Sequence, residues 1–254
     1  MRTICIFNNK GGVAKTTTAL NLGAGLSRIG KKVLLADIDP QNNIDFSMKA
    51  KADSTMADVI DGRITLSQAI FPLGANFDFI AAGSDLSETE KELARESEPE
   101  IVAKLFSNVS GYDYILIDCA PSMGVLNESA LRFCKEVFIP TSADFVGIDA
   151  LNRSIRIIQK LNSQGVETTV SKIIPTLYDK RNKICRESLA EMQNEFGGLV
   201  SYPIRVNSKL KEAPKFGKSI FSYAKSSSGA KDYGMLVEQV LSMRSLAEAE
   251  SIEE

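Results

Sequence analysis

The fold is decided by the stretch Asn9-Lys10-Gly11-Gly12-Val13-Ala14-Lys15-Thr16-Thr17. An apolar run, Thr3–Asn8, precedes it and reads as a β-strand, and the helical pattern Lys15–Ile29 follows it. In a strand–loop–helix unit of this kind, main-chain N–H groups and the positive end of the helix dipole face the loop and bind phosphate. We therefore expect a nucleoside triphosphate, preferably ATP, to bind here with Mg²⁺.

Two side chains of the loop have specific expected roles. Lys15 would reach the β- and γ-phosphates, and the Thr16 hydroxyl would bind Mg²⁺. The standard pattern G-x-x-x-x-G-K-[ST] is not met, because Asn9 and Ala14 replace its two glycines. If residue 14 needs a positive φ, alanine is strained there by roughly 1 kcal/mol; if its φ is ordinary, the methyl group narrows the approach to phosphate. A plain glycine turn with solvated lysines is the alternative interpretation.

Composition narrows the possible functions. The 254 residues are 44% hydrophobic and 24% charged, with a formal net charge of −2, so no overall basic field attracts nucleic acid. The chain lacks histidine, which removes the commonest general base and metal ligand. Its four cysteines are widely spaced, which argues against zinc, an iron–sulfur cluster or a disulfide framework, and favours a reducing cytoplasm.

Short apolar runs alternate with helical patterns along the whole chain. The runs expected to be strands are Thr3–Asn8, Lys32–Asp37, Phe77–Ala81, Tyr114–Asp118, Glu136–Pro140, Val170–Pro175 and Leu199–Ile204. The segments expected to be helices are Lys15–Ile29, Glu98–Asn108, Val125–Cys134, Phe145–Gln164, Ile184–Phe196 and Lys231–Ala249. This alternation predicts one α/β domain over residues 1–254, with a mostly parallel, twisted sheet of about seven or eight strands and helices on both faces. Ligands bind such sheets beyond the carboxyl ends of the strands.

Carboxylates follow two of these strands. Asp37 and Asp39 end the second strand, and Asp118 ends an apolar run typical of a Walker B strand. We expect Asp37 and Asp118 to hold Mg²⁺, through its waters, and Asp39 to orient the attacking water. An acidic strand end is ordinarily a solvated turn. Here the phosphate loop and two acidic strand ends are expected at one edge of the sheet, and together they favour a phosphate-transfer site.

The motifs together resemble the deviant Walker A ATPases of the ParA/MinD superfamily. The segment from Lys10 to Thr17 resembles their K-G-G-x-G-K-[ST] motif, Asp37–Gln41 their switch I, and Asp118–Ser122 their switch II. Two further segments, Pro175–Arg181 and Glu212–Ile220, resemble ParA in particular. The resemblance spans nearly the whole chain and implies a P-loop NTPase fold.

The resemblance also implies how the site works. It predicts an ATP-dependent homodimer in which Lys10 crosses the interface to the partner's nucleotide, as an arginine finger does. Lys10, Lys15 and Asp39 are the expected catalytic residues. The expected nucleotide-binding residues are Lys10, Gly11, Gly12, Val13, Ala14, Lys15, Thr16 and Thr17 of the loop, with Thr176 and Pro203 near the base. The expected metal-binding residues are Thr16, Asp37 and Asp118.

The near-zero net charge conceals a basic segment, residues 205–231, which has seven basic residues and one acidic residue, a net charge of +6. The resemblance implies that dimers bind double-stranded DNA nonspecifically through such residues. The expected contacts are Arg205, Lys209, Lys211, Lys215 and Lys218. The alternative is a solvated loop whose lysines only maintain solubility.

The last residues argue against a membrane role. MinD-like relatives end in a basic amphipathic helix, whereas the segment Arg244–Glu254 is acidic and is repelled by anionic lipid. No apolar run approaches the ~20 residues needed to span a bilayer. The chain begins directly at the first strand, so we expect no N-terminal helix-turn-helix extension.

The resemblance therefore implies a partitioning ATPase with a slow basal rate, cytoplasmic and associated with the nucleoid. A ParB-like partner would stimulate hydrolysis. Two alternatives share this ATPase chemistry: a ParA-like ATPase that positions a non-DNA cargo, and a MinD-like spatial regulator. Two others belong to different classes: a metal-centre ATPase, which would need paired cysteines, and a DNA-binding module without enzymatic activity. The last leaves Lys15, Thr16, Asp37 and Asp118 without a role. The segment from Asn182 to Cys185 lacks the aspartate of a guanine-specific N-K-x-D motif, which favours ATP over GTP as the nucleotide.

Overall fold

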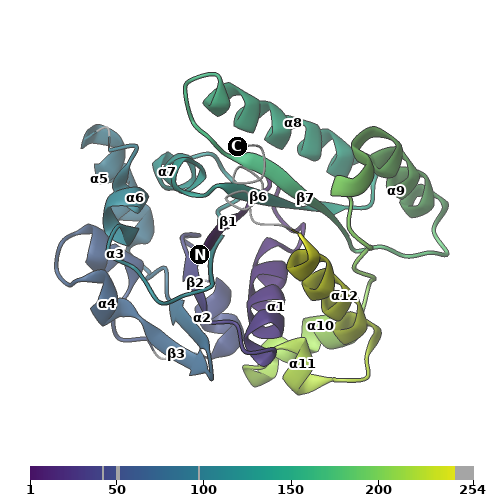
Figure 1. Ribbon diagram of the computed structural model, residues 1–254, viewed down its shortest axis with the longest axis horizontal. Helices are drawn as coiled ribbons and strands as arrows, with labels where there is room; N and C mark the ends of the chain where they lie inside the picture. The colour runs from purple at the N-terminus through teal and green to yellow at the C-terminus, as the bar shows by residue number, and fades with distance from the viewer. Residues whose placement is uncertain (42, 50–51, 97, 244–254) are drawn as a thin grey trace, which may run out of the picture.

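The computed structural model is an α/β structure in which helices cover both faces of one sheet (Figure 1), and it describes residues 1–41, 43–49, 52–96 and 98–243. Its strands are β1 (Arg2–Ile6), β2 (Val33–Asp37), β3 (Phe71–Gly74), β4 (Phe77–Ile80), β5 (Tyr114–Asp118), β6 (Glu136–Ser142) and β7 (Thr169–Thr176). Its longer helices are α1 (Lys15–Arg28), α5 (Leu86–Glu96), α7 (Val125–Phe133), α8 (Phe145–Asn162), α9 (Lys183–Phe196) and α12 (Ser228–Ser242). The shorter helices are α2 (Asn43–Met48), α3 (Met56–Ile60), α4 (Leu66–Ala69), α6 (Ile101–Phe106), α10 (Ser208–Glu212) and α11 (Ile220–Tyr223), with 3₁₀ turns η1 (Gly197–Leu199) and η2 (Ala213–Phe216).

The sheet brings the expected functional strand ends together. Its seven strands run in the order β3-β4-β2-β5-β1-β6-β7, and all neighbouring pairs except β3–β4 are parallel. The strand β5 lies between β1 and β2, and Asp37 is in register with Asp118 across the β2–β5 pair. The loops after β1, β2 and β5 therefore meet at one edge, as the parallel arrangement requires.

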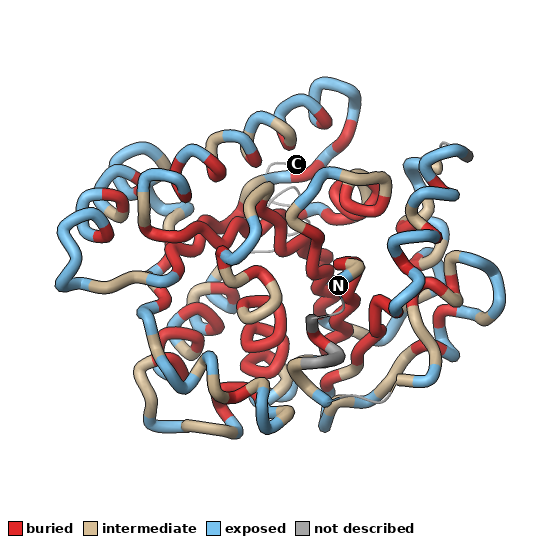
Figure 2. Tube along the Cα trace, turned by 180° about the vertical axis from the view of Figure 1, so that it is seen from behind, coloured by how far each residue is buried: buried red, intermediate tan, exposed pale blue. Residues whose placement is uncertain are grey.

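Alternation along the strands builds a core on each face of the sheet. In β1, Ile4 and Ile6 point to a cluster covered by α1, α11 and α12, while Cys5 points to the cluster covered by α3 to α9. Successive side chains of a strand point to opposite faces, so a strand covered on both sides is apolar throughout. Figure 2 shows the result: the central strands are buried along their length, and the long helices that cover them alternate between buried and exposed residues.

Three parts of the expected secondary structure were wrong or incomplete. The segment Leu199–Ile204 forms only one isolated bridge, at Val200, and a second follows at Arg205, because the intervening Pro203 has no N–H for a ladder. The edge strand β3 was not predicted, since it is short and contains a proline. The helix expected over Glu98–Asn108 is the shorter α6, and the helices α2 to α5, α10 and α11 were not predicted.

Agreement is close for the elements that carry the site. The helix α1 begins at Lys15 as expected and β5 spans Tyr114–Asp118 as expected. The final helix starts at Ser228, slightly before the expected Lys231. The expected acidic end of the chain, Arg244–Glu254, lies outside the described residues.

Candidate nucleotide-binding site

The loop after β1 has the backbone shape of a phosphate-binding loop. Gly12 and Ala14 both have left-handed backbones, with φ of 74° and 66°. Ala14 occupies the N-cap position of α1 and its methyl group cannot cap the helix, so the first-turn N–H groups are available to a ligand. The buried Thr176 hydroxyl at the end of β7 donates a 3.0 Å hydrogen bond to the carbonyl of Val13, which fixes the loop from below.

The two lysines of the loop have different environments. Lys15 is buried, and its Nζ donates a 3.2 Å hydrogen bond to the carbonyl of Lys10. Burial lowers the pKa of Lys15, and the nearby carboxylates Asp118 and Asp39 partly offset this effect. The Lys10 ammonium instead lies at the outer edge, 3.0 Å from Ser142 Oγ and 3.4 Å from Asp144 Oδ1.

Three buried carboxylates face the loop from β2 and β5. Asp37 Oδ1 accepts a hydrogen bond from the N–H of Asp39 (2.9 Å), and its Oδ2 accepts one from the N–H of Ile44 (3.3 Å). Asp39 Oδ1 accepts a hydrogen bond from the N–H of Gln41 (3.0 Å), which holds this carboxylate at the start of the loop after β2. These bonds turn the end of β2 back toward α2, and of these two carboxylates Asp39 lines the cleft beside the loop.

Asp118 is the most unusual of the three. Both its oxygens are buried, and neither has a hydrogen-bond partner among the described residues, although Thr16 and Lys15 lie near enough to moderate its pKa. Burial raises the pKa of Asp118 to about 7, and burial together with Asp118 raises the pKa of Asp37 well above its usual range. A buried carboxylate without donors is suited to a cation and its waters, so Asp118, with Asp37 beside it, fits Mg²⁺.

The ligand set of such an ion would be incomplete without the nucleotide. Among the residues that the structure describes, no group of three or more histidine, cysteine, aspartate or glutamate side chains is arranged to hold a metal. Thr16, Asp37 and Asp118 would therefore hold Mg²⁺ only together with phosphate oxygens and water, as is usual for Mg²⁺ bound with a nucleotide.

A cleft of about 520 Å³ opens above the loop. It is lined by Gly11, Gly12, Ala14, Lys15, Thr16, Thr17, Asp39, Gln41, Ser47, Pro121, Leu177 and Lys211. Loop residues expected from the sequence line it together with Asp39, Gln41 and Pro121 of the two switch segments. The sequence placed Gln41 and Pro121 in the two switch segments without giving them a role, and it did not single out Ser47 or Leu177, which only the fold brings to the loop.

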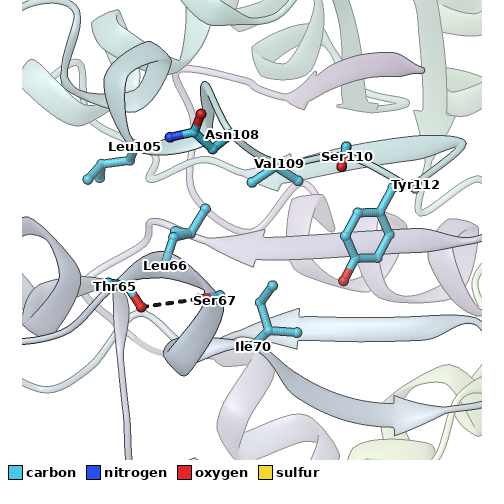
Figure 3. Close-up of a pocket in the computed structure, with 9 residues that line it drawn as sticks. All are labelled: Thr65, Leu66, Ser67, Ile70, Leu105, Asn108, Val109, Ser110 and Tyr112. Carbon is cyan, nitrogen blue, oxygen red and sulfur yellow. Dashed lines mark hydrogen bonds between the residues drawn. The ribbon is translucent and has the colours of Figure 1, made fainter.

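A second hollow of about 510 Å³ lies at the other edge of the sheet, where Tyr112 precedes β5 (Figure 3). Its lining is uncharged: Thr65, Leu66, Ser67, Ile70, Leu105, Asn108, Val109, Ser110 and Tyr112. A triphosphate needs cations and clustered N–H donors. The cleft above the loop therefore fits a nucleotide, and this hollow does not.

The two residues expected near the base lie on the same side of the loop. Thr176 is fully buried and bonds the loop itself, so its hydroxyl positions the backbone. Pro203 is partly buried beside the end of β7, where the N–H of Ile204 donates to the carbonyl of Pro175. Leu177, with φ of 53° and 41% exposed, comes between them and lines the cleft.

The basic segment is less uniform than its sequence suggested. Arg205 forms an ion pair with the buried Asp232, and Lys209 forms one with Glu212. Lys215 and Lys218 are exposed, whereas Lys211 lines the nucleotide cleft. Two of the five expected DNA contacts therefore already have a carboxylate partner.

Residues around the start of α8 were missed altogether. Asp144 caps this helix by accepting a 2.6 Å hydrogen bond from the N–H of Gly147, and it also pairs with Lys10. A Cβ on Gly147 would lie 2.0 Å from the carbonyl of Ser142, so α8 can pack this closely only on a glycine. The two residues that follow Asp144, Phe145 and Val146, are 78% and 54% exposed. An aspartate before an apolar helical run signals the cap, but nothing in the sequence signals its contact with Lys10.

The cysteines belong to the core. Cys5, Cys119 and Cys134 are fully buried in the cluster under α3 to α9, and Cys185 is buried as well. Burial is the main reason that the pKa values of Cys5 and Cys119 lie well above the usual range. Thiols in this state are poor ligands and poor nucleophiles, which disfavours a metal-centre ATPase.

Comparisons with known proteins agree with this geometry. The family model described as "AAA domain" matches residues 1–172. The chromosome-partitioning ATPase Soj of Treponema pallidum is 35% identical over 246 residues, covering 94% of this chain and 97% of that protein. The chain belongs to the ParA/Soj family of partitioning ATPases. The chromosome partitioning protein ParA of Caulobacter vibrioides is 34% identical over 252 residues, covering 95% of this chain and 94% of that protein.

Among solved structures, the fold matches cobyrinic acid a,c-diamide synthase from Mycobacterium smegmatis with a bound ATP analogue and magnesium. The TM-score is 0.80 at 27% identity, and the match covers 95% of this chain and 94% of the other. A P-loop ATPase fold with Mg²⁺ and ATP as its ligands is thus consistent with the residues in the cleft. Within the described part of the chain, none of the helices has the length and apolar character needed to cross a bilayer.

Proposed function

We propose that this partitioning ATPase acts as an ATP-dependent homodimer that binds double-stranded DNA without sequence preference and releases it on hydrolysis. A ParB-like protein carried by the cargo would stimulate hydrolysis, and the protein would work in the cytoplasm on the nucleoid. The observation that supports this proposal most strongly is the set of buried charges at one sheet edge, Lys15, Asp37 and Asp118, beneath a loop with free N–H groups.

The nucleotide would exchange the internal contacts of the site for its own. Lys15 would transfer its hydrogen bond from the Lys10 carbonyl to phosphate oxygens, and the N–H groups from Gly11 to Thr17 would bind the remaining oxygens. Bound Mg²⁺ would neutralise phosphate charge, held by Thr16 directly and by Asp37 and Asp118 through water. Asp39, at the mouth of the cleft, would orient the attacking water.

Dimerisation would complete the site. In the single chain, Lys10 is paired with Asp144 and Ser142 at the rim, beside the exposed side chains of Phe145 and Val146. A self-complementary two-fold contact that covers these apolar side chains would bring Lys10 toward the partner's phosphates. Hydrolysis would then require two chains, because each chain alone keeps this cation away from its own cleft.

DNA would bind to the basic segment. Lys215 and Lys218 are exposed and are the leading contacts, while Arg205 and Lys209 share their charge with Asp232 and Glu212. A single patch of this size binds weakly, so that doubling it in a dimer makes DNA binding depend on ATP. A slow basal rate would follow from this arrangement, because a carboxylate is a weak general base and a partner would have to reorder the switch segments before hydrolysis.

The same chemistry would serve a ParA-like ATPase that positions a cargo other than DNA. Co-purification and identification of the partner would distinguish this function from DNA partitioning. A MinD-like regulator would bind lipid vesicles instead of DNA. Binding of the AMPPNP-loaded protein to anionic vesicles, with duplex DNA as the parallel sample, separates these two functions.

The test is ATPase activity with and without duplex DNA. Lys10→Ala should lose dimer-dependent hydrolysis, because the transition state loses the cation that the partner supplies. Asp39→Ala should bind ATP without hydrolysing it and should therefore remain on DNA. Lys32→Ala, an exposed lysine at the opposite sheet edge, is the matched control and should behave as wild type. If the Lys10→Ala variant hydrolysed ATP at the wild-type rate, the proposed role of the dimer would be contradicted. If the ATP-loaded wild type did not bind DNA at low salt, the proposed DNA binding would be contradicted.

A further inference from the structure

Lys211 lies where the basic segment meets the nucleotide cleft. It belongs to α10, yet it lines the cleft together with the phosphate loop, Asp39 and Ser47. A lysine in this place can contact a bound nucleotide or DNA, and the sequence alone assigned it to DNA. The packing of α10 indicates which of the two it faces.

The other charged residues of α10 are directed away from the cleft. Lys209 pairs with Glu212 at 2.7 Å, and both contact Tyr223, whose hydroxyl donates a 2.7 Å hydrogen bond to Glu212. Positions three apart share one face of a helix, whereas position 211 is rotated by about 200° from position 209. Lys211 therefore projects from the opposite face of α10, the face that borders the cleft.

The position of α10 is itself fixed. Asn207 accepts a 2.8 Å hydrogen bond from the N–H of Lys209 and donates one of 2.6 Å to Ser228 at the start of α12. The following turn packs on α2: a Cβ on Gly217 would lie 2.8 Å from the carbonyl of Met48. Asp37 accepts a hydrogen bond from Ile44 at the other end of α2, so this short helix joins the metal-site carboxylate to the basic segment.

We propose that Lys211 binds a phosphate oxygen of the bound nucleotide, so that the basic segment supplies one wall of the nucleotide site. The inference rests on the proposed nucleotide site and extends it to a residue outside the phosphate loop. An ammonium group gains more from a polyphosphate than from a monophosphate, because its attraction grows with the ligand charge. Lys211 therefore contributes to ATP affinity, and it is not one of the DNA contacts of the nucleotide-bound dimer.

Titration with Mg-AMPPNP and with AMP tests the assignment. Lys211→Gln should weaken AMPPNP binding roughly tenfold, as expected for one charge-assisted contact, and should weaken AMP binding less. Lys211→Arg should restore the AMPPNP affinity to within about twofold, because it keeps the charge. Lys215→Gln, in the same segment but outside the cleft lining, should leave both affinities unchanged. Thermal melts without nucleotide should show equal folding for these surface variants.

A second measurement separates the nucleotide role from a DNA role. At saturating AMPPNP, the slope of log DNA affinity against log salt should be unchanged in Lys211→Gln and shallower in Lys215→Gln. A shallower slope in Lys211→Gln, or AMPPNP affinity within twofold of wild type, would overturn the assignment of Lys211. Lys15→Ala distinguishes the two levels of the argument, because AMPPNP binding that survives this change would refute the nucleotide site as a whole.

Discussion

The phosphate loop and the basic segment are both rich in lysine, but they use their charges differently. In the loop, Lys15 is buried and faces Asp118 and Asp39 across the cleft. In the basic segment, Arg205 and Lys209 are paired with carboxylates of their own surface. The buried charges of the loop are directed at one binding site. In the basic segment, the net charge of +6 is larger than the number of positive side chains that are available to a ligand, because some are already paired with carboxylates. A count of charges is therefore informative only after each has been assigned its partner.

The largest expected effect is the loss of the buried cation. Lys15→Ala should reduce Mg-ATP affinity about 1,000-fold or more, because the bound phosphates would lose their buried ammonium partner, and losing one partner of a buried charge pair costs several kcal/mol. Lys218→Ala, a lysine of the basic segment, should change it less than about twofold. Calorimetric titration of both variants checks the contrast, and equal losses would mean that the two regions do not differ as described.

A smaller effect should come from the buried carboxylate. Asp118→Asn should stabilise the nucleotide-free protein by a few kcal/mol above pH 7, because burial penalises the ionised form of this carboxylate and raises its pKa. The folded-state pKa of Asp118 is raised to about 7 from 3.8, so the wild type loses stability as pH rises between these values and the variant does not. The advantage of the variant should therefore grow from about pH 4 to pH 7 and then level off.

Urea unfolding at several pH values measures this difference, with Asp53→Asn, an exposed carboxylate, as the control. Saturating Mg-ATP should reverse the order, since only the wild type keeps the carboxylate that helps to hold the ion. A variant that is less stable than wild type at pH 8 without nucleotide would contradict the assignment of a buried charge.

DNA binding should show a more modest effect. The double change Lys215→Gln, Lys218→Gln should weaken DNA binding by the ATP-bound protein about tenfold and reduce the salt slope by about two per chain. Arg205→Gln should change the slope by less than one, because its guanidinium is already paired with Asp232. Fluorescence anisotropy with a labelled duplex over a salt series provides both values. A larger slope change for Arg205→Gln would show that the ion pair opens for DNA.

The smallest effect concerns residue 14. Because the φ of Ala14 is 66°, Ala14→Gly should stabilise the protein by roughly 1 kcal/mol and leave ATP affinity equal or tighter. Thermal melts and nucleotide titration measure the two effects. Gly30→Ala, at another left-handed position with φ of 88°, should have the opposite effect on stability. A clear loss of ATP affinity in Ala14→Gly would contradict the loop geometry.

The sequence predicted the site best where function follows from local chain geometry. The loop from Asn9 to Thr17 and the apolar run ending at Asp118 each lie within one strand–loop unit, and parallel pairing brings them together. Both alternatives for Ala14 were open in the sequence, and the positive φ is the one that occurs.

Contacts between distant segments could not be predicted in the same way. Asp144 meets Lys10 across 134 positions, and Lys211 reaches the cleft only because α10 is held by Asn207 and Tyr223. The expected strand Leu199–Ile204 is apolar enough for a sheet, yet Pro203 prevents a continuous ladder. These arrangements depend on tertiary packing, which periodicity and composition do not encode.

The buried thiols have a practical consequence for labelling experiments. All four native cysteines are buried, so a maleimide dye should react with them only when the protein opens. A cysteine introduced in place of Phe145 would then be the fast-reacting group, on a background that needs no prior removal of native thiols. Its reaction rate would report directly on whether a second chain covers that position when ATP is added.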